Sequence, residues 1–341
     1  MDVVRAVGQQ VFARPANIGT VFRWGGSGER QVTKEITYTN AGDSPVTLDL
    51  TVDGDTLRTS AQRVEVAAKG TASVTVTIDG TGKQPGDHAG TITARSGDLV
   101  VRTVTTAYVE PESHDVKVSA LGMDGRSVSA VGEFYNAKGE SHRMILSGVP
   151  DTYRLPAGEW SLYVDIFEGM RVTTTHLPMN VGEQGMEIVL DTRQAKPIRF
   201  TLDQPTAVIS GWTEMWVING SWHLGWVGGR PDPSAVYFVL ASEQPGLRYV
   251  TRMHFHDEDG SVARYDLVDE RHGGIPADPT YSARVKDLDK VTTTFRGGGT
   301  AAKGTYFVAT AIEGVSDGFL TPTNDVPLPG KLAEYRTRGR Q

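Results

Sequence analysis

The chain contains no cysteine among its 341 residues. This absence excludes disulfide bonds, thiolate metal sites and cysteine nucleophiles. It does not decide the cellular compartment, because chains without thiols occur in the cytosol and among bacterial secreted proteins alike.

Long apolar runs and basic patches are also missing. No stretch approaches the roughly 18 to 20 apolar residues that a membrane helix requires, so we expect no membrane span. The net charge is −7 and the basic residues are dispersed, which argues against nucleic acid as a partner. The first residues, MDVVRAVGQQVF, lack the basic region and apolar run of a signal peptide, so we do not expect this chain to be exported by itself.

Short alternating segments and turn residues are abundant. Apolar residues alternate with Thr and Asp over residues 46–52 and 74–78, which is the period-2 pattern of half-buried strands. Residues that favour turns lie between such segments at 40–43, 68–70 and 85–87. The pattern predicts an all-β fold, with an antiparallel sandwich over about residues 31–110.

The length allows several domains, since single cores stop growing well before 341 residues. Glu110-Pro111-Glu112 is a stiff polar step and marks the first expected boundary. We predict tandem antiparallel β-sandwiches: a short helix over 1–12, a first sandwich over 13–110, a second over 113–196, a third over 197–330 and a polar tail over 331–341.

The first sandwich resembles a known domain. Residues 32–40 (VTKEITYTN), 45–48 (PVTL), 64–76 (VEVAAKGTASVTV) and 85–90 (PGDHAG) are similar to the fibronectin-III-like domain that follows the catalytic domain of large secreted subtilisin-like serine proteases. Residues 2–7 (DVVRAV) resemble the last helix of that catalytic domain. The resemblance implies that residues 1–12 are a remnant of the protease domain, whose catalytic part lies upstream.

The second sandwich carries a weaker resemblance. Residues 155–160 (LPAGEW) look like the LPPGTY step of transthyretin-like or carboxypeptidase-regulatory-like sandwiches, and residues 188–198 (IVLDTRQAKPI) look like a strand of actinobacterial subtilisin-like proteases. Thr192 stands where that family has Ala. The third sandwich is assigned from its strand pattern, with strands expected at 236–240, 249–254, 291–295 and 306–312.

A serine protease site is not recognisable in the sequence. A subtilisin-like enzyme needs a His-Gly-Thr step and a Gly-Thr-Ser-Met turn, and neither occurs; His272 is followed by Gly273 and Gly274. Residues 314–318 (GVSDG) match the G-x-S-x-G pattern, but the residues after them predict a strand, whereas that motif requires a helix. We therefore expect a loop there and no enzyme activity in this chain.

A histidine-rich segment is the only candidate metal site. His254 and His256 would share one strand face, with Asp257 and Asp259 close by. Such residues could bind zinc, and a structural calcium is the favoured alternative. The alternative is a strand end that runs into an Asp-Gly turn, and no other cofactor is expected.

Four tryptophans, Trp212, Trp216, Trp222 and Trp226, lie within fifteen residues. Asn219-Gly220 between them predicts a hairpin with a type I′ turn, which sets Val217 opposite Trp222. Trp222 and Trp226 would then share one face and Trp212 and Trp216 the other. Because both faces are apolar, a buried strand pair is favoured; an exposed Trp212 and Trp216 would instead form a platform for sugar rings or a protein ligand.

These observations favour a non-catalytic β region of a secreted subtilisin-like serine endopeptidase. Its expected partners are the catalytic domain of the same protein and a protein or peptide substrate, and its expected place is outside the cell or at the cell surface. The first alternative is a carbohydrate- or surface-binding β protein that contacts a polysaccharide through the tryptophan hairpin. The second is a metal enzyme that uses His254 and His256.

Overall fold

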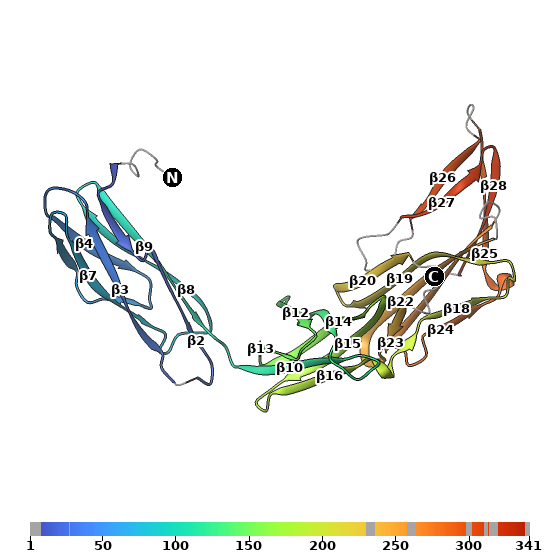
Figure 1. Ribbon diagram of the computed structural model, residues 1–341, viewed down its shortest axis with the longest axis horizontal. Coiled ribbons are helices and arrows are strands. Elements are labelled where there is room, and N and C mark those ends of the chain that lie inside the picture. Colours follow the sequence, from blue (N-terminus) through green and yellow to red (C-terminus); the bar gives the residue numbers. More distant parts are fainter. Residues whose placement is uncertain are drawn as a thin grey trace. The chain divides into compact units, whose positions relative to one another are not determined.

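The structure is a computed structural model that describes residues 8–26, 28–229, 236–257, 263–297, 302–309, 313 and 320–337. The chain is an all-β protein, as the sequence predicts (Figure 1). It divides into two compact units. Unit 1 extends to His114 and includes Arg154–Ala157, and unit 2 holds Asp115–Tyr153 and the chain from Gly158 onward.

Unit 1 is a sandwich of two sheets, with strand orders β1-β3-β7-β5 and β2-β9-β8-β4-β6. Its strands are β1 (Val11–Arg14), β2 (Asn17–Phe22), β3 (Gln31–Asn40), β4 (Val46–Asp53), β5 (Leu57–Thr59), β6 (Arg63–Val66), β7 (Thr71–Asp79), β8 (Gly86–Ser96) and β9 (Leu99–Val109).

Alternation builds the core of unit 1. In β7, Val74, Val76 and Ile78 are buried while the threonines between them face outward. Leu48 and Leu50 of β4 join the same apolar core. The strand predictions over 46–52 and 74–78 are therefore confirmed, because one face of each strand is covered and the other is solvated.

The remaining sheets have the strand orders β13-β10-β16, β12-β11-β14-β15-β21-β17, β18-β24, β20-β19-β22-β23-β28-β25 and β26-β27. They belong to unit 2, except for residues 113–114 of β10 and 154–156 of β13, which are part of unit 1. The two six-stranded sheets are called sheet D (containing β14) and sheet F (containing β22). The strands before residue 198 are β10 (Ser113–Leu121), β11 (Ser129–Tyr135), β12 (Ser141–Ser147), β13 (Asp151–Pro156), β14 (Gly158–Glu168), β15 (Arg171–Val181), β16 (Met186–Asp191) and β17 (Lys196–Pro197), with the short 3-10 helix η1 (Thr192–Gln194).

The second half of unit 2 is also almost entirely strand. Its elements are β18 (Arg199–Leu202), β19 (Val208–Asn219), β20 (Trp222–Gly229), β21 (Tyr237–Val239), β22 (Ser242–His256), β23 (Ala263–Ile275), β24 (Thr280–Ala283), η3 (Val285–Asp287), β25 (Asp289–Phe295), β26 (Lys303–Ala309), β27 (Leu320–Pro327) and β28 (Gly330–Arg336).

The structure has two units where the sequence predicts three sandwiches. One apolar core contains Tyr163 of sheet D together with Met215, Val217 and Tyr249 of sheet F. In addition, β21 pairs with β15 and with β17 inside sheet D. No division therefore falls at residue 197, because strands from both sides of it share a sheet and a core.

Three further expectations differ from the structure. Residues 1–7 of the expected amino-terminal helix lie outside the described residues, and its last two residues, Val11 and Phe12, begin β1. The expected polar tail is wrong over β28, where Leu332 is fully buried. The sheets are mixed, because parallel pairs such as β2·β9 and β23·β28 accompany the expected antiparallel ones.

Among the residues that the structure describes, no helix has the length and apolar character needed to cross a bilayer.

Candidate binding groove

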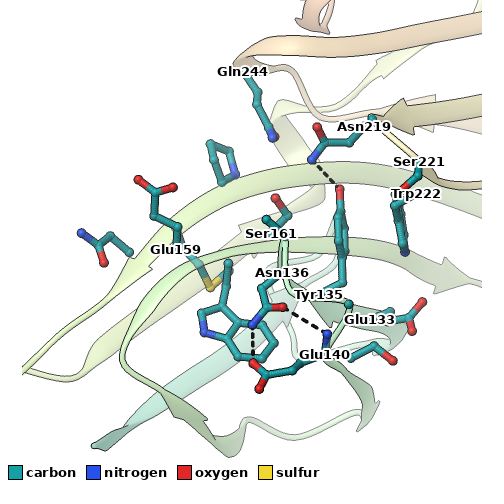
Figure 2. Close-up of a pocket in the computed structure, with 18 residues that line it drawn as sticks. Glu133, Tyr135, Asn136, Glu140, Glu159, Ser161, Asn219, Ser221, Trp222 and Gln244 are labelled. Atoms are coloured by element: carbon teal, nitrogen blue, oxygen red, sulfur yellow. Dashed lines mark hydrogen bonds between the residues drawn. The ribbon is translucent and has the colours of Figure 1, made fainter.

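A cavity of unit 2, called the groove below, has a volume of about 940 Å³ (Figure 2). It lies where the end of sheet D meets the turn of the β19–β20 hairpin. Its lining residues are Glu133, Tyr135, Asn136, Ala137, Gly139, Glu140, Ser141, Glu159, Trp160, Ser161, Pro178, Met179, Asn180, Asn219, Gly220, Ser221, Trp222 and Gln244.

The pairing of β11, β14 and β15 sets the floor of the groove. Tyr135 pairs with Ser161, and Ser161 pairs with Pro178. Paired residues and their neighbours two positions away project from the same face of a sheet. Glu133 and Glu159 therefore stand on the groove side, while Leu162 and Val164 alternate with them and are buried.

A tight loop between β11 and β12 forms one wall. The Asn136 side-chain oxygen accepts hydrogen bonds from the backbone N–H groups of Lys138 (3.0 Å) and Glu140 (3.1 Å), and Gly139 has a φ of 82°. Asn and Gly both favour such turns. The Asn136 amide also donates to the Glu140 carboxylate at 2.5 Å, which holds that carboxylate at the groove.

The hairpin turn forms the opposite wall, with a register that differs from the prediction. Asn219 pairs with Trp222, so the turn residues are Gly220 and Ser221 rather than Asn219 and Gly220. Gly220 has a φ of 61° and Ser221 does not have a positive φ, which matches the type II′ pattern with Gly at the first position. Asn219 remains in the strand because its amide donates to the Tyr135 hydroxyl at 2.9 Å.

Shifting the pairing by two residues keeps every side chain on its predicted face. Trp222 and Trp226 pack against the core that contains Met215 and Val217, whereas Trp216 packs on the other side with Ile218. Trp216 is only 7% exposed. The buried interpretation of the hairpin thus holds for Trp216, and the side chain of Trp212 lies outside the described part of the structure.

An aromatic stack joins the hairpin to sheet D. The rings of Trp222 and Tyr135 are parallel, with centroids 3.9 Å apart (Figure 2). The Tyr135 hydroxyl also lies 2.5 Å from Nε2 of His176, which is fully buried. Burial raises the pKa of Tyr135 to about 12 and lowers the pKa of His176 to about 4. Both groups are therefore neutral near pH 7, so they position the wall and do not carry charge.

A second cavity of about 260 Å³ adjoins the groove through Glu133, which lines both. Asp165 lines this cavity and accepts hydrogen bonds from the hydroxyls of Tyr163 and Thr174. Burial raises the pKa of Asp165 to about 6, although these hydrogen bonds act in the opposite direction. Arg143, which is exposed, lies on the rim of the same cavity.

His254 belongs to a buried ionic cluster on sheet F. The cluster consists of Glu214, Arg252, His254, Arg264, Asp266, Glu334 and Arg336. Nδ1 of His254 contacts Asp266, and its Nε2 lies 3.5 Å from a Glu214 oxygen. Arg252 lies 3.4 Å from Glu214 and 3.6 Å from Asp266.

The cluster balances charge within the sheet. Burial by itself would raise the pKa of Asp266, but the hydrogen bond from His254 and the charges of Arg264 and Arg252 hold it well below its usual range. Three carboxylates face three guanidinium groups, which compensates the cost of removing these charges from water. A general base in a serine protease receives its proton from a hydroxyl through Nε2, whereas Nε2 of His254 faces a carboxylate.

Of the candidate metal residues, the described pair His254 and His256 is not brought together. Nδ1 of His256 lies 2.6 Å from the carbonyl oxygen of Asp257, away from the His254 contacts. Asp259 lies outside the described residues, as do residues 314–318 with Ser316. Within the described parts of the chain, no group of three or more His, Cys, Asp or Glu side chains could hold a metal ion.

Sequence reasoning missed most of the groove. Of its residues, only Trp222 was a candidate, while Glu133, Glu140 and Glu159 were not. The turn at Asn136 and Gly139 was a usable signal for one wall. The floor carried no local signal, because Glu133 and Glu159 come to line the same groove only through the pairing of β11 with β14.

No protein-family model matches the sequence, and no curated protein matches it. Several solved structures are similar to parts of the chain. The Caenorhabditis elegans MSP family member WR4 is 9% identical, and the match covers 30% of this chain and 98% of that one with a TM-score of 0.23. The PapD-like domain 7 of human CEP192 is 16% identical over 30% of this chain and 87% of its own, with a TM-score of 0.24.

A larger share of the chain matches a chaperone. The periplasmic chaperone SfaE is 10% identical, covering 52% of this chain and 99% of its own, with a TM-score of 0.23. None of the three named proteins indicates a subtilisin-like parent. The function must therefore be argued from the groove and from the sequence.

Proposed function

We propose that this chain is a non-catalytic binding region of a secreted subtilisin-like serine endopeptidase, where it supports the catalytic domain and holds protein substrate. The observation that carries the proposal is the groove, an open cavity of about 940 Å³ that is lined by both aromatic and polar side chains. Cavities of this size with few, well-placed polar groups are typical ligand sites.

The proposal of a subtilisin-like parent protein is based on the sequence resemblance. The segments similar to the fibronectin-III-like domain of subtilisin-like proteases fall on strands of unit 1, including β3, β4 and β7. The LPAGEW step falls at the junction of β13 and β14, where Trp160 is only 3% exposed. A buried aromatic is what the step provides in transthyretin-like sandwiches, so both resemblances agree with the local structure.

The chemistry of the groove supports binding rather than bond breaking. The pKa of Tyr135, at about 12, keeps its hydroxyl protonated near pH 7, so it is a weak nucleophile. The lining carboxylates Glu140 and Glu159 are exposed to solvent. Solvated carboxylates bind polar ligands but are poor general acids near neutral pH.

The test is binding of an unfolded protein to the purified chain. Fluorescein-labelled, chemically unfolded casein is titrated with the chain and followed by fluorescence anisotropy. We expect saturable binding, and we expect Ser141→Trp or Asn180→Trp, which fill the groove, to weaken it by roughly tenfold or more. Ser147→Trp, also exposed but outside the groove, is the matched control and should bind normally.

The absence of activity is tested separately. A serine-directed fluorophosphonate probe should not label the chain, and the chain should not cleave casein. Stoichiometric labelling, above all of Ser316, would contradict a non-catalytic role.

A second candidate function is binding of a polysaccharide. The lining favours it through its carboxylates, amides and hydroxyls next to the Trp222 ring, since sugars bind by hydrogen bonds and stacking. The proposed contact differs from the platform of Trp212 and Trp216, because Trp216 is buried. Quenching of tryptophan fluorescence by neutral oligosaccharides, lost in Asn180→Trp, would favour this function over protein binding.

A further inference from the structure

The second cavity of unit 2, which Asp165 and Leu224 line, suits a small ligand. Its volume is about 260 Å³, just below the roughly 300 to 1,000 Å³ of pockets that hold drug-sized molecules. Val131, Tyr163 and Leu224 supply apolar surface. A ligand that fits this cavity therefore has few atoms and an apolar body.

Strand pairing brings the lining residues together. Val131 pairs with Asp165, and Glu133 pairs with Tyr163, so these four side chains project from one face of sheet D. Leu224 belongs to β20 of sheet F. The cavity is therefore built by residues of both six-stranded sheets.

Two neutral hydroxyls hold the carboxylate of Asp165 in place. The Tyr163 hydroxyl lies 3.1 Å from Oδ1 and 3.0 Å from Oδ2, and the Thr174 hydroxyl donates to Oδ1. A carboxylate offers about four lone-pair positions. Oδ2 of Asp165 therefore keeps the capacity to accept a further hydrogen bond from a ligand.

The protein supplies no cation to this carboxylate. Among the described residues, Asp165 forms hydrogen bonds with hydroxyls and no ion pair. Arg143 lines the same cavity but stands directly opposite Glu133 on the neighbouring strand, so these two charges offset each other at the rim. An ionised Asp165 without a partner is costly in the empty cavity, and a cationic ligand would remove that cost.

The occupied oxygen decides which cation fits. A guanidinium group pairs with a carboxylate through both oxygens, whereas Oδ1 of Asp165 already accepts from Tyr163 and Thr174. An ammonium group is a compact donor that needs one oxygen. The geometry therefore favours an ammonium group at Oδ2.

Exposed apolar side chains continue the cavity along sheet D. Ile145 pairs with Val131, and Phe167 lies two positions beyond Asp165 on the same face. They are 48% and 41% exposed. The apolar body of a ligand that extends beyond the cavity would contact these side chains.

We propose that this cavity binds a small primary ammonium ion with an apolar body, which donates to Asp165 and packs between Val131 and Leu224. The inference goes beyond the binding of unfolded protein in the groove and does not depend on it.

The experiment compares two matched ligands on the full chain. The probe is 2-phenylethylammonium, and 2-phenylethanol is the neutral match, because a hydroxyl replaces the ammonium group on the same body. Isothermal titration calorimetry at about pH 7.5 should show saturable binding of the amine, roughly tenfold or more tighter than binding of the alcohol, since a hydrogen bond to a charged group is the stronger one.

The pH dependence identifies the carboxylate. Burial raises the pKa of Asp165 to about 6, so the ionised form that binds an ammonium group is lost as the pH falls through that value. Lowering the pH from about 7.5 to about 5 should weaken binding of the amine roughly tenfold. His176, which pairs with Tyr163 from β15, stays neutral in this interval because burial lowers its pKa to about 4. Glu133 and Arg143 also face the cavity, so variants of Asp165 are needed.

Matched variants locate the ammonium group and the apolar body. Asp165→Asn keeps the size of the side chain and should remove both the preference for the amine and the pH dependence. Val131→Trp fills the cavity from an exposed position and should weaken both ligands roughly tenfold or more. Glu183→Gln, an exposed change outside the cavity, should bind both ligands normally. Circular dichroism verifies that each variant keeps the fold.

Three outcomes would overturn the inference. If the amine and the alcohol bind equally, Asp165 does not select a cation. If neither ligand shows saturable binding, the cavity holds water alone. If the amine binds Asp165→Asn or Val131→Trp as tightly as the unchanged chain, its site lies elsewhere on the protein.

Discussion

The two units bury different kinds of polar groups. In unit 1 the buried polar side chains that the structure describes are all uncharged: Asn40, Thr56, Thr103, Thr105 and Ser113. Unit 2 buries six of the seven residues of the ionic cluster, all except the partly exposed Arg336, as well as Asp269 and His176. Both units are β sandwiches in architecture, yet among the described residues only unit 2 buries acidic side chains, arginines and histidines.

The difference indicates two ways to stabilise a sheet. Unit 1 depends on apolar side chains that alternate with solvated ones, so its strands share one pattern, with an apolar buried face and a solvated face. Unit 2 covers both faces of β22, where seven consecutive buried residues from Tyr249 to Phe255 leave no face for solvent. Charges on such a strand must be paired, and this requirement makes unit 2 the sensitive half of the protein.

Removing one guanidinium from the cluster should have the largest effect. Arg252→Met leaves Glu214 and Asp266 with less compensation, and we expect unit 2 to lose about 3 to 5 kcal/mol of unfolding free energy. Urea unfolding followed by tryptophan fluorescence reports this, because five of the six tryptophans lie beyond residue 158. The matched change in unit 1 is Arg63→Met at the exposed Arg63–Asp49 pair, which should leave circular dichroism transitions unchanged. Equal effects would remove the contrast between the units.

Two buried groups of unit 2 should give opposite pH dependences. Because burial raises the pKa of Asp165 from 3.8 to about 6, its stabilising contribution is complete below pH 3.8 and is lost as the pH rises through 6. Because burial lowers the pKa of His176 from 6.5 to about 4, its contribution is present above pH 6.5 and is lost as the pH falls toward 4. Each amounts to about 3 kcal/mol, so they nearly cancel in the intact protein.

Single variants expose the two contributions. Asp165→Asn should make the stability of unit 2 rise with pH between about 4 and 6.5, and His176→Gln should make it fall over the same interval. Unfolding midpoints in urea at several pH values measure both slopes. If stability depends on pH in both variants as it does in the unchanged chain, these two groups have their ordinary pKa values.

The two units can also be compared at one residue type, an asparagine that is buried in unit 1 and half-exposed in unit 2. Asn40, 1% exposed, donates to the carbonyl oxygen of Ser44 at 2.8 Å and accepts from the Gly42 N–H at 2.9 Å. Asn40→Ala leaves these groups unpaired, and we expect a loss of about 2 kcal/mol in unit 1. Asn136→Ala removes similar bonds in a half-exposed loop of unit 2, where water replaces them, and should cost about 1 kcal/mol or less. Thermal unfolding by calorimetry measures both.

Replacing a turn glycine should destabilise the two units by similar amounts. Gly97 joins β8 to β9 with a φ of 57°, and Gly220 joins β19 to β20 with a φ of 61°; no atoms crowd either one. Alanine at each position disfavours the left-handed backbone, so Gly97→Ala and Gly220→Ala should each cost about 1 kcal/mol. A much larger cost at Gly220, seen as a lower unfolding midpoint, would mean that the groove wall depends on this turn.

Local patterns predicted much of unit 1. The alternation at Val74 and Val76 located β7, and the turn residues after Asn40 located the next loop, because half-buried strands and turns leave their marks in neighbouring residues.

The predicted hairpin around Gly220 was correct in its faces and wrong by two residues in its pairing. That error arose because a distant contact, Asn219 to Tyr135, selected the turn.

Unit 2 could not be predicted to the same extent. The sequence predicts His254 as a metal ligand, whereas the structure pairs it with Glu214 and Asp266. These partners come from other strands, so the residues around His254 in the sequence give no sign of them. The polar appearance of residues 331–341 hid β28, in which Glu334 is only 1% exposed. Charged residues predict solvent exposure unless their partners are known, and here the partners are set by sheet topology.

The parallel pairing of β23 with β28 places Arg264 next to Glu334, about seventy residues further along the chain. Glu214, Arg252 and Asp266 are therefore synthesised well before the last members of their cluster. Until residue 336 has been synthesised, the edge of β23 has no neighbour and its charges stay hydrated. Sheet F can be completed only after β28 has been synthesised, so the order of synthesis itself delays the maturation of unit 2.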